Sequence, residues 1–210
     1  MAEKYRRYDH YQPPTSPFHQ KMHTFIADYG PTPPPHDQVA KMARYIVHNA
    51  DWGAISTHSS SPAIRGFPFA NIVSISDGTS TNSSGVPYMY ITPLELSTRD
   101  LEIDPRCSLA LSLAETDYCK QQNIDPEDPR CARVILTGKV KRVKTHTSEI
   151  DYAENALFSR HPAMRSWPRS HGFYFAKLKI EQILVLDYYG GPKIVPKPEY
   201  FNPGDVRFRI

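Results

Sequence analysis

Four adjacent residues near the middle of the chain could together hold an anion. The stretch ITPLELSTRDLEIDPRCSLALSL, residues 91–113, carries Ser97-Thr98-Arg99-Asp100 shortly before an apolar strand. If Ser97 is the N-cap of a short helix, its hydroxyl can accept a hydrogen bond from the amide of Asp100. The free amides of Thr98 and Arg99 then point outward at the positive end of the helix dipole. This spacing predicts a helix end that could bind a phosphate group.

Other catalytic patterns are absent from the sequence. It contains no Gly-x-Ser-x-Gly elbow, no phosphate-binding glycine-rich loop and no His-Glu-x-x-His. His19 and His23 have the spacing of a metal pair but no cysteine nearby, so we interpret them as a chance pair and expect no metal site. His58, His161 and His171 could serve a haem or flavin, although surface or hydrogen-bonded core positions are the simpler interpretation.

The three cysteines differ in their surroundings. Cys107 lies inside the apolar strand and is expected to be free and buried. Cys119 and Cys131 bracket the polar loop CKQQNIDPEDPRC between two strand-like runs, where paired strands would bring the ends of the loop together. We predict a disulfide across it, stabilising by about 3 kcal/mol. The alternative is two unpaired thiols in a reducing cytosol.

Asn82-Ser83-Ser84 is a glycosylation acceptor triplet in the turn-rich loop DGTSTNSSG. Like the predicted disulfide, it favours a secreted protein. The first residues, MAEKYRRYDHYQ, contain no apolar segment of the kind found in signal peptides. We therefore expect either a cytoplasmic protein or a mature chain whose leader is absent from this sequence.

Composition and charge narrow the class of protein. Of the 210 residues, 40% are hydrophobic and 22% are charged, which is ordinary for a globular domain. The formal net charge of +3 is too small to imply nucleic acid. The densest basic run, GKVKRVK at 138–144, is interpreted as a solvated strand end. No apolar run approaches the ~18 residues that a membrane span needs.

Periodicity predicts a mainly β, α+β protein. In DQVAKMARYIVHN the apolar side chains share one helical face, and Lys41, Arg44 and His48 take the other. Two further helices are expected, a short one after Ser97 and one over 146–162, where Ser148-x-x-Asp151 resembles a capping box. Six strands are predicted, at 54–59, 69–76, 87–92, 107–113, 132–143 and 173–188.

Short connections between consecutive strands favour one antiparallel sheet, closed into a barrel to remove its edges. Seven of the twenty prolines fall in residues 1–36, which favours an extended arm. The expected organisation is an N-terminal arm over 1–36, a barrel domain over 37–196 and a C-terminal tail over 197–210.

Several strings together resemble the CREG family of secreted and lysosomal glycoproteins. They are GFPFANIVSISDG, VPYMYITPLELSTRDLEIDPRCSLALSL, the Cys119/Cys131 loop, RHPAMRSWP and FYFAKLKIEQILVLDYYGGPKIV. The resemblance covers residues 38–201. More distantly, the chain resembles the FMN-binding split barrels, which include pyridoxamine-phosphate oxidases and haem-degrading proteins. This resemblance implies a homodimeric split β-barrel with a flavin-sized groove at the subunit interface.

The same resemblance casts doubt on phosphate binding. Arg65 could supply a second guanidinium beside Arg99, but the flavin-binding relatives also carry basic residues on the strand that here reads ANIVSIS, and this strand has none. Ser74 and Ser76 can donate hydrogen bonds but cannot balance a dianion. The Asp100 carboxylate could cap the same amides and repel a phosphate. We therefore interpret Arg65, Ser97, Thr98 and Arg99 as a vestigial phosphate site and expect no bound cofactor.

Three functions follow as hypotheses. The first, which the CREG resemblance implies, is a non-catalytic secretory or lysosomal glycoprotein that acts as a homodimer through a receptor or other protein partner. The second is an FMN-dependent oxidoreductase of the pyridoxamine-phosphate-oxidase-like type. The third, a transcriptional regulator, is disfavoured because the sequence has no basic recognition helix.

Overall fold

The computed structural model describes residues 32–204. Most of the expected N-terminal arm lies outside the described residues, as do His19, His23 and the last residues of the expected tail. The described elements, in chain order, are α1 (Val39–Asn49), β1 (Trp52–His58), η1 (Pro62–Ile64), β2 (Pro68–Ser74), β3 (Ser76–Thr79), β4 (Asn82–Ile91), α2 (Leu96–Ile103), β5 (Arg106–Ser112), η2 (Leu113–Glu115), α3 (Tyr118–Gln121), β6 (Arg133–Arg142), α4 (Ser148–Arg160), η3 (Pro162–Ser166), η4 (Arg169–His171), β7 (Tyr174–Leu186), β8 (Lys193–Val195) and α5 (Lys197–Phe201).

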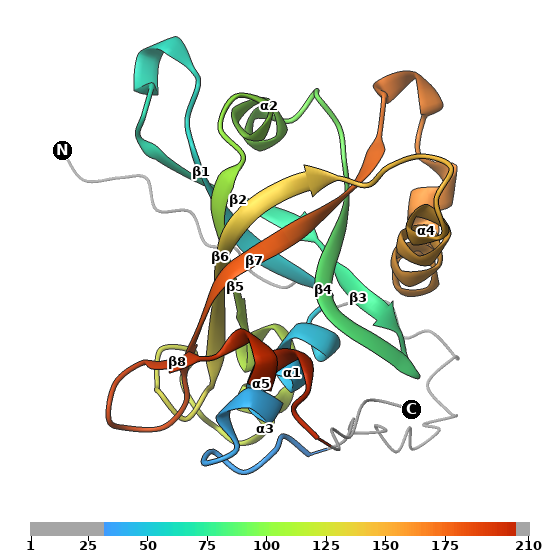
Figure 1. The fold of residues 1–210 in the computed structure, drawn as a ribbon. Helices are drawn as coiled ribbons and strands as arrows, with labels where there is room; N and C mark the ends of the chain where they lie inside the picture. The colour runs from blue at the N-terminus through green and yellow to red at the C-terminus, as the bar shows by residue number, and fades with distance from the viewer. Residues whose placement is uncertain (1–31, 205–210) are drawn as a thin grey trace, which may run out of the picture.

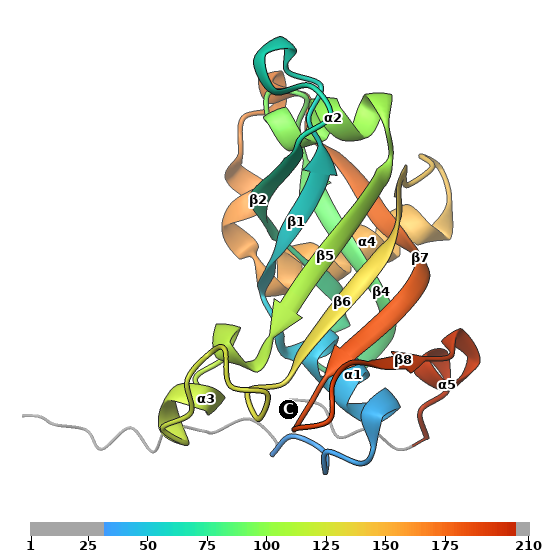
Figure 2. The same cartoon turned by 90° about the vertical axis from the view of Figure 1, so that its left-hand side faces the viewer.

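The strands form one antiparallel sheet that curls into a split barrel (Figure 1). Neighbouring strands follow the order β2-β1-β5-β6-β7-β4-β3, and β8 pairs with β7. In Figure 1, α2 lies at one end of the barrel, α1 and α5 lie at the other end, and α4 lies beside β3 and β4. Figure 2, turned by 90°, shows β1, β5 and β6 with no helix in front of them. The predicted α+β antiparallel split barrel is confirmed.

The predicted count of six strands is wrong, because the described residues form eight. The run 69–76 divides at Ile75, whose amide donates to the carbonyl of Asp51 (3.0 Å) instead of joining either ladder. Before Ile75 the chain pairs with β1, and after it with β4. The last strand, β8, spans only three residues and is too short to show a period of two.

Alternating side chains of the strands fill the barrel. Leu109, Leu111, Val134, Leu136 and Ile183 point inward and are at most 1% exposed, as the alternation in the sequence predicts. A smaller cluster packs α4 against the outer face of β4 and β7. This second cluster explains why the two strands are apolar on both faces over part of their length.

The helices appear where periodicity predicts them, but some of their details differ. Arg44 and His48, expected on the solvent face of α1, are 4% and 1% exposed. The predicted capping box at Ser148 is wrong, because Ser148 is the first residue of α4 and Thr147 takes the cap position without a side-chain cap bond. A capping box exists instead at Ser112 and Glu115, at the start of η2.

The segment expected to be a tail begins with a packed helix. α5 occupies Lys197–Phe201 and lies against α1. Tyr200 is fully buried in the main core, and its hydroxyl donates to the carbonyl of Gly85 (2.6 Å). The packed domain therefore continues beyond residue 196.

Candidate functional site

A groove opens between β2 and β4, next to the start of α2. We call it the β2–β4 groove. It is lined by Asn71–Ser74, Tyr90–Thr92, Glu95, Ser97, Thr98, Met164, Trp167 and Phe173, and it encloses a cavity of about 210 Å³. Ligand pockets in proteins usually hold about 300–1,000 Å³, so the groove of a single chain is small for a flavin.

The polar side of the groove carries a carboxylate. The side-chain amide of Asn71 donates to Glu95 Oε2 and to Ser97 Oγ, both at 3.1 Å. This bridge ties β2 to the beginning of α2. Among the residues lining the groove there is no Lys or Arg, so its only formal charge is the negative one of Glu95.

The structure brings only two of the four predicted phosphate-binding residues into this groove. Ser97 and Thr98 line it and are buried. Arg65 is exposed in the loop between β1 and β2 and does not line the groove. Arg99 is also exposed, and its Nε donates to the carbonyl of Pro93 (2.8 Å). The two guanidinium groups thus lie outside the cavity that they were expected to serve.

The predicted cap at Ser97 is wrong. α2 begins at Leu96 with Glu95 in the cap position and no side-chain cap bond, so Ser97 lies inside the helix. The Ser97 hydroxyl instead accepts from the side-chain amide of Asn71 on β2.

Asp100 also has a different role from the one predicted. Its carboxylate accepts from Thr57 Oγ1 (2.9 Å), from the Ser60 amide (2.6 Å) and from Ser60 Oγ (2.7 Å). Burial alone would raise the pKa of Asp100, but these hydrogen bonds outweigh burial and lower it. The carboxylate holds the loop after β1 in place and does not cap α2, so the expected competition with a phosphate does not occur there.

Sequence reasoning missed the aromatic wall of the groove. Tyr90 stacks on Phe173 at 4.9 Å and on Trp167 at 6.1 Å between ring centroids, and Trp167 lies 4.9 Å from Phe173. Trp167 directly follows η3. Its neighbours come from β4 and from the segment before β7, so no local spacing in the sequence could reveal the wall.

A second polar assembly, also missed, lies between α1 and the β3–β4 hairpin. The carboxylate of Asp77, which is fully buried, meets His48 Nδ1 at 2.6 Å and accepts from Ser83 Oγ at 2.5 Å. Arg44 Nη2 donates to the carbonyl and hydroxyl of Ser83, and its Nη1 donates to the carbonyl of Tyr200 (3.2 Å). These bonds join α1, the hairpin and α5 into one unit.

This assembly contains His, Asp and Ser, but they are not arranged for nucleophilic catalysis. In a catalytic triad the serine donates to the imidazole, whereas the Ser83 hydroxyl donates to the Asp77 carboxylate. Burial would raise the pKa of Asp77, yet His48, Ser83 and the Gly85 amide together lower it. The carboxylate is therefore an ionised structural anchor.

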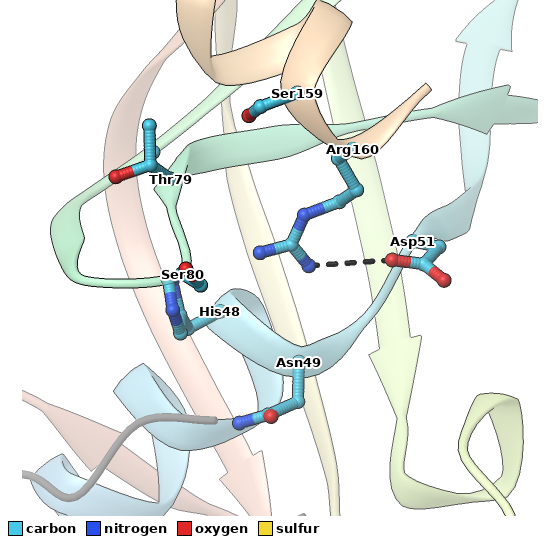
Figure 3. A pocket seen from close by; sticks show the side chains of 8 residues that line it. His48, Asn49, Asp51, Thr79, Ser80, Ser159 and Arg160 are labelled. Carbon is cyan, nitrogen blue, oxygen red and sulfur yellow. Dashed lines mark hydrogen bonds and ion pairs between the residues drawn. The ribbon is translucent and has the colours of Figure 1, made fainter. Parts of the chain in front are cut away.

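A polar cavity of about 320 Å³ lies next to this assembly (Figure 3). His48, Asn49, Asp51, Gly78, Thr79, Ser80, Ser159 and Arg160 line it. Arg160 Nη1 donates to the carbonyl of Ala50 (3.2 Å) and to Asp51 Oδ1 (3.4 Å). The one guanidinium of the cavity is thus already bonded within the protein.

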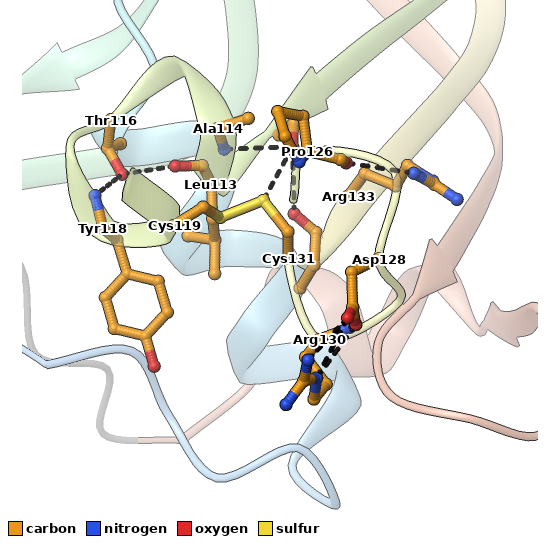
Figure 4. Close-up of a disulfide and its surroundings, with 12 residues drawn as sticks. Leu113, Ala114, Thr116, Tyr118, Cys119, Pro126, Asp128, Arg130, Cys131 and Arg133 are labelled. Atoms are coloured by element: carbon orange, nitrogen blue, oxygen red, sulfur yellow. Dashed lines mark hydrogen bonds and ion pairs between the residues drawn. A yellow bond between two sulfur atoms is a disulfide. The ribbon is translucent and has the colours of Figure 1, made fainter. Parts of the chain in front are cut away.

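The predicted disulfide is present (Figure 4). Cys119 of α3 and Cys131, just before β6, are bonded with a Cα–Cα distance of 5.6 Å, and both are buried. The loop between them carries an ion pair of Arg130 and Asp128 (2.6 Å). Cys107 is free and buried as predicted, and burial raises the pKa of its thiol to about 12, which keeps it protonated.

The predicted glycosylation triplet begins at the tip of the β3–β4 hairpin. Asn82 is exposed and is the first residue of β4. The Ser84 hydroxyl donates to the carbonyl of Asp77 (2.7 Å).

Two kinds of feature are not found in the described part of the chain. No group of three or more His, Cys, Asp or Glu side chains within residues 32–204 could hold a metal ion. No helix in that range is long and apolar enough to cross a membrane. His58, His161 and His171 line neither the β2–β4 groove nor the polar cavity beside α1, and His161 Nε2 contacts the carbonyl of Ile75 (2.9 Å).

The fold and the groove together define a split β-barrel protein with a small cavity between two of its strands. Solved structures agree: a heme binding protein from Mycobacterium smegmatis superposes with a TM-score of 0.61 at 21% identity, over 81% of this chain and 61% of that one. A Clostridium acetobutylicum protein of the pyridoxinephosphate oxidase family gives a TM-score of 0.52 at 10% identity, over 80% of this chain and 99% of that one. At these identities the likeness shows the fold. The chain spans less than two thirds of the mycobacterial protein.

The chain belongs to the CREG family. The family described as "CREG, beta-barrel" matches residues 34–202. The chain is 50% identical to Protein CREG1 of Gallus gallus, over 81% of this chain and 89% of that protein. It is 47% identical to Protein CREG1 of Homo sapiens, over 82% and 77%, and 41% identical to Protein CREG2 of Mus musculus, over 78% and 56%.

Proposed function

We propose that this protein is a non-catalytic glycoprotein of the CREG type. In this proposal it is a homodimer that acts through a receptor or other protein partner, and its flavin groove is degenerate. It is secreted or lysosomal.

The observation that carries the proposal is the charge of the β2–β4 groove. A phosphate needs cations or several free amides around it, and the groove presents the carboxylate of Glu95 instead. Arg65 and Arg99 lie outside it. With a cavity of only about 210 Å³ in one chain, both size and charge disfavour a flavin phosphate.

The dimer is supported by apolar side chains that surround the groove. Ile72, Leu94, Leu96 and Trp167 are 59%, 58%, 49% and 37% exposed. Exposed apolar area gathered around one cavity is characteristic of an interaction surface, and a second copy would cover it symmetrically. The compartment is supported by the Cys119–Cys131 disulfide and by the exposure of Asn82.

The test is a cofactor titration of the purified full chain. We expect no flavin or haem absorbance after purification, and no saturable binding when FMN is added at micromolar concentration. A matched pair of variants tests the reason. Glu95→Gln should leave FMN binding weak because no cation is gained, whereas Ser74→Arg, which adds a guanidinium on β2, should strengthen it.

The second candidate function is an FMN-dependent oxidoreductase, and the stacked wall of Tyr90, Trp167 and Phe173 favours it because such rings can hold a planar cofactor. Stoichiometric, tight FMN binding by the unmodified protein would contradict the degenerate groove and favour this candidate. Haem binding with a defined absorbance band would likewise overturn our proposal.

A further inference from the structure

Five cationic side chains project from one face of β5, β6 and β7, and we call this surface the basic face. Arg106 of β5 lies directly opposite Lys139 of β6, which lies opposite Lys179 of β7. In the next row Lys141 lies opposite Lys177. Residues paired directly, or two apart on one strand, point to the same side of a sheet. In Figure 2 no helix lies in front of β5 and β6.

The arrangement brings like charges together without full compensation. Like charges directly opposite on neighbouring strands destabilise a sheet. Arg106 is neutralised by Asp104 (2.6 Å), and Lys177 by Glu149. The remaining three, Lys139, Lys141 and Lys179, form no ion pair with any of residues 32–204, and all three side chains are exposed. The nearby carboxylate of Glu181 on β7 is itself paired with Lys197 (3.9 Å). The fold thus retains an unbalanced charge of three, for which an external anion would compensate.

The sheet, and not the basic run in the sequence, builds this surface. The run GKVKRVK contributes only Lys139 and Lys141 to the basic face. Its Arg142 stacks instead over the ring of Tyr174, with the guanidinium carbon 4.3 Å from the centroid. The other three cations come from β5 and β7.

We propose that the basic face binds a sulfated polysaccharide. The chemistry of the face selects this class of partner. β6 is paired on both edges, so a peptide cannot add to it through main-chain hydrogen bonds. Along the same face the next residues are Ser108 and Thr137, whose hydroxyls bond each other (3.0 Å), and Gln182 of β7, which lies opposite Thr137. They offer no ring on which a nucleic-acid base could stack and no apolar side chain to enter a membrane.

A sulfated polysaccharide needs only what this face supplies. Its anions are closely spaced along an extended chain, and lysine ammonium groups bind such anions as point charges without a fixed geometry. Adjacent strands lie about 4.8 Å apart, and residues two apart on a strand lie about 6.7 Å apart. Lys179 and Lys141 therefore lie about 4.8 and about 6.7 Å from Lys139 along the backbone grid, so successive sulfates can each meet an unpaired lysine.

The experiment measures binding of a heparin oligosaccharide to the full chain by surface plasmon resonance over a series of salt concentrations. The test variant replaces the three unpaired lysines, Lys139→Gln, Lys141→Gln and Lys179→Gln. At about fivefold per lysine near an anionic surface, the dissociation constant should rise on the order of a hundredfold, and the salt dependence should become shallower. Because the substitutions remove like-charge pairs, the thermal midpoint should not fall.

The matched control removes the same net charge from side chains that do not belong to the basic face. It carries Arg65→Gln, Lys120→Gln and Lys193→Gln, three exposed cations outside the basic face, and should bind within about twofold of the parent, because salt screens the attraction of charges farther away than about 8 Å. An equal loss in the control, no loss in the test variant, or equal affinity for the desulfated polysaccharide would overturn the proposal. Tighter binding of polyglutamate or of duplex DNA would overturn the choice of partner. If the triple variant does not fold, Lys139→Gln alone must still weaken binding about fivefold.

Discussion

The stability of this protein should increase as the pH falls from neutral to mildly acidic values, and Glu115 should be the main cause. Its Oε1 accepts from the Ser112 amide (3.2 Å), while its buried Oε2 has no hydrogen-bond partner in the described residues. Burial raises the pKa of this carboxyl from 4.5 to about 8, against the effect of the Ser112 amide. The folded protein therefore keeps a proton that the unfolded chain releases.

The sign and size follow from this difference. Because the folded-state pKa is the higher one, the stabilisation is complete below about pH 4.5 and is lost as the pH rises towards 8. Between about pH 5 and about pH 7.4 the unfolded chain releases this proton while the folded protein largely keeps it. The unfolding free energy therefore falls by about 3 kcal/mol over this range. Asp187 acts in the same direction. Burial raises its pKa from 3.8 to about 6, although the nearby His36 and Lys193 oppose this shift. The loss of unfolding free energy that comes from Asp187 is about 1 kcal/mol.

The assay is urea unfolding with the disulfide intact, followed by tryptophan fluorescence at both pH values. The parent should lose about 4 kcal/mol of unfolding free energy between them. Glu115→Gln should reduce the loss to about 1 kcal/mol and stabilise the protein at the higher pH. The control, Glu127→Gln, changes an exposed carboxylate of the disulfide loop and should behave as the parent. A parent that is equally stable at both pH values, or a Glu115→Gln variant with the parent's pH dependence, would refute the reasoning.

Three further predictions rest on separate features. Replacing both Cys119 and Cys131 by serine should lower the unfolding free energy by about 3 kcal/mol; mapping of unreduced peptides should find the two cysteines linked, and free alkylation of both would contradict this. Light scattering should give twice the chain mass of 23.9 kDa, and a monomer mass at micromolar concentration would count against the dimer. Asp100→Asn should destabilise by about 2 kcal/mol, because the charge-assisted bonds from Thr57 and Ser60 weaken, and should leave FMN binding unchanged; a gain in FMN affinity would restore the competition that we first expected at this residue.

The fold could be predicted because strands and helices leave local periodic signals. The alternation around Leu109 and Leu136, and the helical spacing from Val39 onward, appear in the structure as expected. Strand boundaries were less predictable. Ile75 continues the alternation in the sequence, but the chain changes partner there, and a change of partner depends on residues far away.

The sites were harder to predict because their residues meet only after folding. His48 follows the polar face of α1 by its spacing, yet it is buried because Asp77, from another element, pairs with it. Ser97 has the residue type of a helix cap, but Asn71 on β2 is its partner. In the basic face, Lys179 contributes through its register with Lys139, which no spacing along the chain encodes.

If Asn82 is glycosylated, as we propose, the β3–β4 hairpin bears on when the sugar is added. An enzyme that glycosylates Asn82 reads the whole triplet, including the Ser84 hydroxyl. In the folded hairpin that hydroxyl donates to the Asp77 carbonyl, and the neighbouring Ser83 hydroxyl donates to the Asp77 carboxylate. Because the folded hairpin already engages the hydroxyl that the enzyme needs, its hydrogen bonds would favour addition of the sugar before this segment folds.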